Sequence, residues 1–204
     1  MDGTTPQGDR NSRGVFTSGG CYWRSMASIT DGTSNTAVFS EKAIGGAAGI
    51  RKLRGGIALV SGNPLNAAPT SAASCSVAAC LAARSGDEFS SAVSNANLQS
   101  SIYVGRMWLT GTPTRTGFST IIPPNGSSCG NSASSESSRA IATATSYHPG
   151  GVQVGLGDGS VRFISETINA ATSGGVDFCV TSGISPFGVW GALGSMNGGE
   201  STSP

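Results

Sequence analysis

A single histidine and an Asp-Gly pair are the residues of this sequence whose spacing first suggests chemistry. Nine residues separate His148 from Asp158, and Gly159 follows. An imidazole and a carboxylate can exchange a proton or bind a metal ion, provided that the fold brings them together. Asp-Gly is also a preferred turn of a two-stranded hairpin. The chemistry therefore depends on the element that positions the two side chains.

Residues 147–168 have the pattern of a β-hairpin, with the Asp-Gly pair as a two-residue type I′ turn. A strand rises about 3.3 Å per residue, so residues 152–158 alone would keep the histidine and the aspartate about 20 Å apart. We therefore interpret Asp158 and Gly159 as turn residues. We expect His148 to be hydrogen-bonded where the first strand begins.

The predicted turn also determines which hairpin residues share a face. With the turn centred on the Asp-Gly pair, Leu156 lies opposite Val161. One face then carries five apolar side chains, Val152, Val154, Leu156, Val161 and Phe163. The opposite face includes Gly155 and Gly157, which have no side chain and therefore allow another chain or a ligand to approach closely.

Other catalytic arrangements lack support in the sequence. A serine hydrolase needs a histidine base near its serine and a carboxylate that orients the histidine. The G-x-S-x-G nucleophile motif does not occur. No two carboxylates have a spacing that indicates paired acid–base work. We therefore expect a protein that is not an enzyme.

Calcium binding is an alternative for three carboxylates, Asp31, Glu41 and Asp158, because calcium prefers oxygen ligands. Neither an EF-hand loop nor a nonapeptide calcium repeat accompanies them. The favoured interpretation is structural, with Asp31 in an Asx-turn and Glu41 in an ion pair with Arg162 or Lys42. We expect no cofactor, with calcium as the weaker hypothesis.

The composition limits the classes of protein that the chain can represent. It has 204 residues, a formal net charge of +1, only 11% charged residues and 31 glycines. This balance gives no argument for a nucleic-acid partner. A weakly charged chain rich in glycine and small polar residues fits an exported protein of strands and loops. No run of apolar residues is long enough to span a membrane.

We expect one globular domain at residues 14–196, between a flexible lead-in at 1–13 and a polar tail at 197–204. An Ala- and Ser-rich insertion occupies residues 61–101. The predicted fold class is α+β, strand-rich and built on an antiparallel sheet. Outside the hairpin, the pattern predicts a short buried strand at 37–39, short helices at 78–84 and 88–98, and a helical turn at 187–193.

Four stretches, in this order, resemble one bacterial family: ITDGTSNTAVFSEKA at 29–43, GRMWLTGTPTRTGFSTIIPPNGSSC at 105–129, SYHPGGVQVGLGDGSVRFISETIN at 146–169 and VWGALGSMNGGE at 189–200. The family is named for a prepilin-type processing-associated motif of His, nine residues and Asp-Gly. The resemblance implies a pilin-like head domain that is extracellular, on the cell surface or periplasmic. Full-length members begin with a leader and a long apolar helix. We therefore expect a fragment, or a split or reduced member whose partner supplies that helix.

The five cysteines form no zinc motif, and their pairing does not follow from sequence. The resemblance favours a disulfide between Cys80 and Cys129, which flank the part of the chain similar to the family's Pro-Pro-Asn and Cys element. Cys75–Cys80, and any pair that uses Cys21 or Cys179, stay open.

The resemblance implies a non-enzymatic structural or interaction module, similar to a type IV pilin or pseudopilin. Such a module would assemble into a homo-oligomer or filament, or dock on a partner chain that supplies the pilin helix. We expect the apolar hairpin face to pack against a helix. The alternative is an extracellular carbohydrate-binding module, which Trp23, Trp108 and Trp190 suggest, although Trp108 and Trp190 lie in apolar runs typical of a core.

Overall fold

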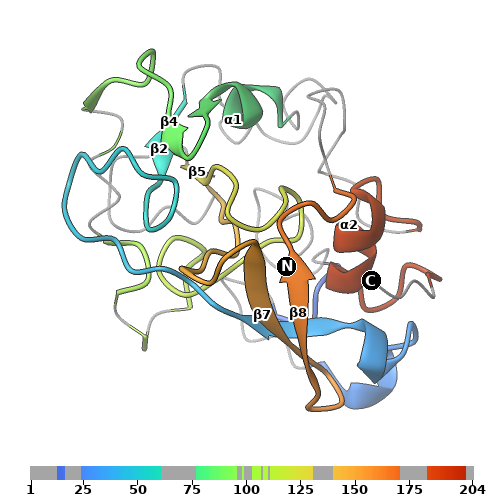
Figure 1. Cartoon of the computed structure of the whole chain (residues 1–204). Coiled ribbons are helices and arrows are strands. Elements are labelled where there is room, and N and C mark those ends of the chain that lie inside the picture. The colour runs from blue at the N-terminus through green and yellow to red at the C-terminus, as the bar shows by residue number, and fades with distance from the viewer. Residues whose placement is uncertain are drawn as a thin grey trace.

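The computed structural model describes residues 13–16, 24–60, 77–95, 98, 103–106, 108–109, 111–130, 140–170 and 183–200. Within these ranges, short strands and turns predominate over helices (Figure 1). In chain order the elements are η1 (Met26–Ser28), η2 (Thr33–Asn35), β1 (Ala37–Ser40), β2 (Ala58–Leu59), α1 (Ala78–Ala82), β3 (Arg84–Ser85), β4 (Glu88–Phe89), β5 (Cys129–Gly130), β6 (Ala140–Ile141), β7 (Gly151–Leu156), β8 (Val161–Ser165) and α2 (Gly188–Gly194). The predicted α+β, strand-rich class with antiparallel sheets is confirmed.

Much of the predicted lead-in, insertion and tail lies outside the described residues. At the first described segment, Arg13 is buried rather than solvated. Its guanidinium donates a hydrogen bond to the carbonyl of Gly183 and another, of 3.4 Å, to the hydroxyl of Ser195. The beginning and the end of the described chain are therefore in direct contact.

The hairpin β7–β8 is part of a three-stranded antiparallel sheet in the order β1-β7-β8, with β7 in the centre (Figure 1). The inner face of this sheet packs into a cluster of buried side chains, Ala37, Ala144, Val152, Val154, Leu156, Ile164, Trp190 and Leu193. Trp190 is fully buried, and its indole N–H donates a 3.0 Å hydrogen bond to the carbonyl of Ile122. Helix α2, which confirms the predicted helical turn, therefore covers the inner face of the sheet.

The hairpin turn differs from the predicted type I′ turn. The Gly159 N–H donates to the carbonyl of Leu156 at 3.0 Å, and the Leu156 N–H donates to the carbonyl of Ser160 at 2.9 Å. Gly159 has a φ of 85°, whereas Asp158 does not have a positive φ. These features define a three-residue loop, a type I turn followed by a glycine bulge. The two-residue turn was therefore wrong, although Gly159 does occupy a left-handed position.

The extra loop residue shifts the register of β8 by one position, which exchanges its two faces. Ile164 lies opposite Val152 and is only 1% exposed. Val161 and Phe163 were expected on the buried face, but they are 66% and 49% exposed. The predicted burial is therefore correct for β7 and wrong for β8.

The other half of the described chain is held together by a second sheet and a disulfide. Strand β5 pairs in parallel with β2 and antiparallel with β6. The Cys80–Cys129 disulfide connects α1 to β5, which confirms the predicted pair. It belongs to a second buried cluster, Val77, Cys80, Ile121, Ile122, Cys129, Ile141 and Phe187. The helix predicted at 78–84 is present as α1, but residues 88–89 form strand β4 instead of beginning a helix.

Candidate functional site

The two ends of the His-x9-Asp-Gly motif lie at opposite ends of β7. His148 precedes the strand, and its Nε2 lies 3.1 Å from Oε1 of Glu41. Asp158 lies in the turn, where its Oδ1 accepts hydrogen bonds from the N–H of Ser160 at 2.9 Å and from its hydroxyl at 2.7 Å. These bonds hold the pKa of the Asp158 carboxyl below its usual value. The two side chains therefore work separately, each on its own local structure.

Glu41 joins the end of β1 to the beginning of β7. Its Oε2 accepts the Gln153 N–H at 2.8 Å, while Oε1 faces His148. Burial raises the pKa of the Glu41 carboxyl, but hydrogen bonds from Gln153, Ser146 and His148, with the charge of the imidazole, outweigh that effect and lower the pKa below its usual value. A carboxylate with this many donors is well suited to fastening two strands together.

Ser146, His148 and Glu41 bring together the side-chain types of a hydrolytic triad, but the connections differ. In a triad the histidine lies between the serine and the carboxylate. Here the Ser146 side chain bonds to Glu41 directly, and the Ser146 oxygen accepts the backbone N–H of His148 at 3.1 Å. These contacts therefore differ from the order of a triad, in which the imidazole connects the serine to the carboxylate.

The three candidate calcium ligands do not converge. Asp31 accepts two backbone N–H groups near the end of the described chain, from Gly198 at 2.7 Å and Gly199 at 2.9 Å. Glu41 and Asp158 bind the protein groups described above. Within the described part of the chain, no three His, Cys, Asp or Glu side chains gather as a metal site. Each carboxylate is placed to hold a backbone segment.

Lys42 has a different environment from the one expected. Its Nζ donates a 2.8 Å hydrogen bond to the carbonyl of Gly117, away from Glu41, whose side-chain partner is His148. The residue as a whole is partly exposed. Its ammonium group is nevertheless desolvated, and this burial lowers the pKa of Lys42 to about 8. The predicted pairing of Glu41 with Lys42 or Arg162 is replaced by the pairing with His148.

Asn125 is a central residue that the sequence reasoning missed. It is buried, with a φ of 61°, and it is the one described non-glycine residue with a positive φ. Its Oδ1 accepts the Ser146 N–H at 2.9 Å, and its Nδ2 donates to Oε2 of Glu166 at 3.1 Å. The Pro-Pro-Asn-Gly sequence could have indicated this position, because asparagine tolerates the left-handed conformation of a type II turn.

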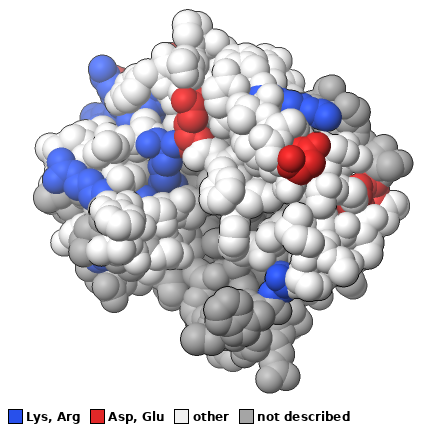
Figure 2. Space-filling view, turned by 90° about the horizontal axis from the view of Figure 1, so that it is seen from below, with Lys and Arg blue, Asp and Glu red and all other residues white. Residues whose placement is uncertain are grey.

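The outer face of the β1-β7-β8 sheet carries exposed apolar side chains. Phe39 of β1 is 66% exposed and lies opposite Gly155, which in turn lies opposite Val161. Phe163 is the next outer residue along β8. Figure 2 looks from the side of the β7–β8 turn and shows charged residues as separate spots among uncharged ones. Phe39, Val161 and Phe163 are therefore an exposed apolar group on the outer face, where Gly155 leaves a gap between Phe39 and Val161.

Comparison with known proteins identifies the family. The family model described as "Protein of unknown function (DUF1559)" matches residues 1–171. The chain belongs to this family. No curated protein and no solved structure matches the DUF1559 chain. The match includes β7, β8 and the His148 motif, and it ends before α2, which completes the core of the sheet.

The four stretches of this DUF1559 chain that were compared with the prepilin-type family are residues 29–43, 105–129, 146–169 and 189–200, and they are linked in space. The first is tied to the last through Asp31, and the second is tied to the hairpin through Asn125.

Two tryptophans differ in exposure. Trp190 is buried, as expected, whereas Trp108 is 81% exposed, so its predicted place in the core is wrong. Trp23 lies outside the described residues. Among the described helices, none has the length and hydropathy that crossing a membrane requires.

Proposed function

We propose that this DUF1559 chain is a structural or interaction module of an exported, pilin-like protein, and that it is not an enzyme. It self-associates or docks on a partner chain. The observation that carries the proposal is the outer face of the β1-β7-β8 sheet, where Phe39, Val161 and Phe163 are exposed side by side. Contiguous apolar surface on a folded protein commonly marks an interaction site.

The inner face of the sheet is already occupied. The inner face, which carries Val152 and Val154, packs against a helix, as expected. That helix is α2 of the same chain rather than one supplied by a partner. Trp190 and Leu193 of α2 fill the space that a pilin helix was expected to take. The proposal therefore assigns the partner contact to the opposite face.

The polar groups near the motif support a structural role for the module. His148 and Glu41 fasten β1 to β7, and Asp31 holds the segment that follows α2. These bonds keep the sheet and its neighbours in a fixed relation. A rigid sheet that presents a prepared apolar face loses little conformational entropy on binding, which favours association.

The Cys80–Cys129 disulfide and the low charge support an extracellular, cell-surface or periplasmic location. Disulfides persist in oxidising compartments, whereas cytosolic thiols are kept reduced. Finding the mature protein only in the cytosol, with both thiols free, would contradict this part of the proposal. Fractionation followed by thiol labelling measures both properties at once.

Sedimentation velocity of the isolated chain over a range of concentrations tests the association. We expect the average mass to rise above the 20.3 kDa of one chain. Burying a valine side chain contributes about 1.5–3 kcal/mol, so Val161→Lys should weaken association by about tenfold or more. Ile184→Lys is the matched control, since Ile184 is also exposed and lies outside the sheet. A mass that stays at one chain throughout, or equal effects of the two variants, contradicts self-association through this face.

Carbohydrate binding is the second candidate, and the exposure of Trp108 favours it. An exposed indole beside the exposed Leu109 offers a flat surface on which a sugar ring can stack. Titration with a panel of neutral oligosaccharides should then quench tryptophan fluorescence in the wild type. Trp108→Ala should abolish the effect without changing the unfolding temperature. An absence of quenching with every oligosaccharide contradicts this candidate.

A further inference from the structure

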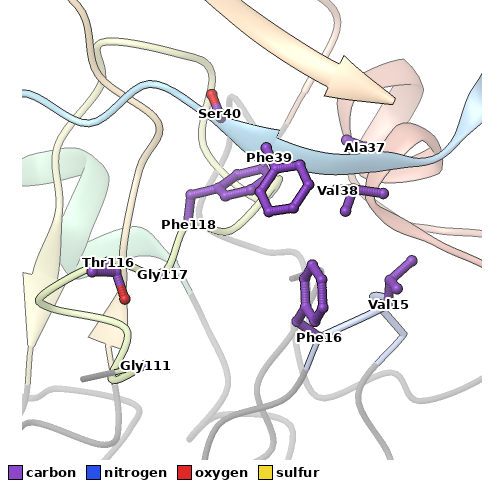
Figure 3. A pocket seen from close by; sticks show the side chains of 10 residues that line it. All are labelled: Val15, Phe16, Ala37, Val38, Phe39, Ser40, Gly111, Thr116, Gly117 and Phe118. Atoms are coloured by element: carbon purple, nitrogen blue, oxygen red, sulfur yellow. The ribbon is translucent and has the colours of Figure 1, made fainter. Parts of the chain in front are cut away.

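A groove runs along the free edge of β1. It lies between β1, the segment at residues 13–16 and the loop at residues 111–118, and its volume is about 360 Å³. Figure 3 shows Phe16, Phe39 and Phe118 pointing into this space beneath β1. Its lining residues are Val15, Phe16, Ala37, Val38, Phe39, Ser40, Gly111, Thr116, Gly117 and Phe118. Both the strand edge and a facing wall are therefore present.

The backbone of β1 presents hydrogen-bonding groups to this groove. Among the described strands, β1 pairs only with β7. The Glu41 N–H donates to the Gln153 carbonyl at 3.3 Å, which makes the neighbouring pair of Ser40 and Val154 a non-hydrogen-bonded pair. The N–H and C=O of Ser40 consequently point away from β7, towards the groove. An edge of this kind is a template for another strand.

The lining of the groove determines the character of its occupant. Every described lining residue is uncharged, and three are phenylalanines, two of which, Phe16 and Phe39, have ring centroids 5.9 Å apart. The ammonium of Lys42 is directed to the carbonyl of Gly117. A charged occupant would lose its hydration without gaining an ion pair from these lining residues. The occupant that complements the groove is uncharged and apolar.

The facing wall favours a narrow partner. Residues of the 111–118 loop line the groove together with β1, so an occupant contacts both sides at once. A single extended segment can enter, because a strand needs only about 4.8 Å beside its neighbour. Backbone pairing would supply affinity, and the aromatic lining would select the side chains.

We propose that the free edge of β1 is a docking site for an extended, uncharged segment of a partner chain, which adds to the β1-β7-β8 sheet as a fourth strand. The inference rests on the proposed interaction role and names the kind of partner contact. Its location, however, is the edge of the sheet rather than the outer face.

A short peptide provides the probe for this site. The peptide is a fluorescent, end-blocked heptapeptide of alternating threonine and valine, and binding is measured by anisotropy. A second peptide of the same sequence, methylated on every backbone nitrogen, lacks the donors that strand pairing needs. A third replaces each valine by glutamate. We expect binding of the first peptide only, with exchange of the Ser40 amide hydrogen slowed about tenfold at saturation.

Gly111→Leu is the variant that blocks the groove. No atom lies within 4 Å of a Cβ built at Gly111, and its φ is not in the left-handed region, so the larger side chain enters the open space without strain. We expect this variant to bind the first peptide about tenfold more weakly, because two or three methylene-sized groups of contact are lost. Val161→Lys alters the outer face alone and should bind the peptide as the wild type does.

The results of the peptide experiment can contradict the docking site without contradicting the proposed function. Equal binding by the wild type and Gly111→Leu, equal binding of the methylated peptide, or no binding of the first peptide overturns the docking site. Loss of peptide binding in Val161→Lys overturns its location at the strand edge. The sedimentation experiment changes Val161, whose side chain does not line the groove, whereas Phe39 belongs to both surfaces.

Discussion

Asn125 provides the sharpest test of how the segment before the hairpin is held in place, and we predict that Asn125→Ala destabilises the domain by about 3–4 kcal/mol. The substitution removes the acceptor of the buried Ser146 N–H and the donor to Glu166. Each such bond contributes about 1 kcal/mol, and leaving a buried N–H without a partner costs about 1 kcal/mol more. Alanine at a φ of 61° adds about 1 kcal/mol of backbone strain.

Asn125→Gly separates these contributions, because glycine adopts a positive φ without strain. We expect Asn125→Gly to be about 1 kcal/mol more stable than Asn125→Ala, and still less stable than the wild type. Urea unfolding followed by far-ultraviolet circular dichroism gives the three free energies of unfolding. A loss below about 1 kcal/mol in Asn125→Ala, or a glycine variant less stable than the alanine variant, refutes the reasoning.

Three further perturbations test other parts of the structure. Ile164→Ala should cost about 2–5 kcal/mol and Val161→Ala less than about 1 kcal/mol, measured by urea unfolding, because only Ile164 is buried in the observed register. The folded pKa of Glu41 lies below its unfolded value of about 4.5, so its contribution is complete above that pH and is lost as the pH falls through the folded value. The stability difference between the wild type and Glu41→Gln should therefore shrink in acid. Replacing both Cys80 and Cys129 by serine should cost about 2–4 kcal/mol in thermal unfolding, because the disulfide closes a loop with a sequence separation of 49.

Each of these predictions has a contrary result. Equal costs at Ile164 and Val161 would contradict the observed register, and a larger cost at Val161 would favour the two-residue turn. A Glu41→Gln difference that is constant from neutral to acidic pH would mean that the carboxylate does not need its charge to hold Gln153. If the double serine variant unfolds at the same temperature as the wild type, the disulfide does not stabilise the domain by restricting the unfolded chain, in spite of its sequence separation of 49.

The sequence was sufficient to predict the hairpin but not its register. Asp158-Gly159 correctly marked the turn, since Gly159 has the required positive φ. The local pattern does not contain the contacts that set the loop length. The N–H of Gly157 binds the carbonyl of Thr36, and the N–H of Asp158 binds the carbonyl of Thr33. These bonds come from a segment more than one hundred residues away, so a turn rule that uses neighbours alone cannot include them.

For the candidate site, the sequence predicted the separation of the motif residues but not the partner of Glu41. The spacing argument correctly separated His148 from Asp158, because the six-residue strand β7 lies between them. The partner of Glu41 was wrong, since β1 and β7 pair in a register that places Glu41 beside Gln153 and His148. Charge complementarity alone favoured a lysine or an arginine. The position of each strand, which only the fold provides, selected the histidine.

Reduction of the disulfide should affect one part of the described chain more than the other. Cys80 and Cys129 belong to the buried cluster around α1 and β5, whereas the cluster behind the β1-β7-β8 sheet contains no cysteine. Reduction should consequently loosen α1 and β5 first and leave the hairpin amides protected from hydrogen exchange. The hydrogen bond from Trp190 to Ile122 is a direct link between the two clusters. The apolar sheet face should therefore persist in a chain that has lost its covalent link, with this bond as a remaining connection between the clusters.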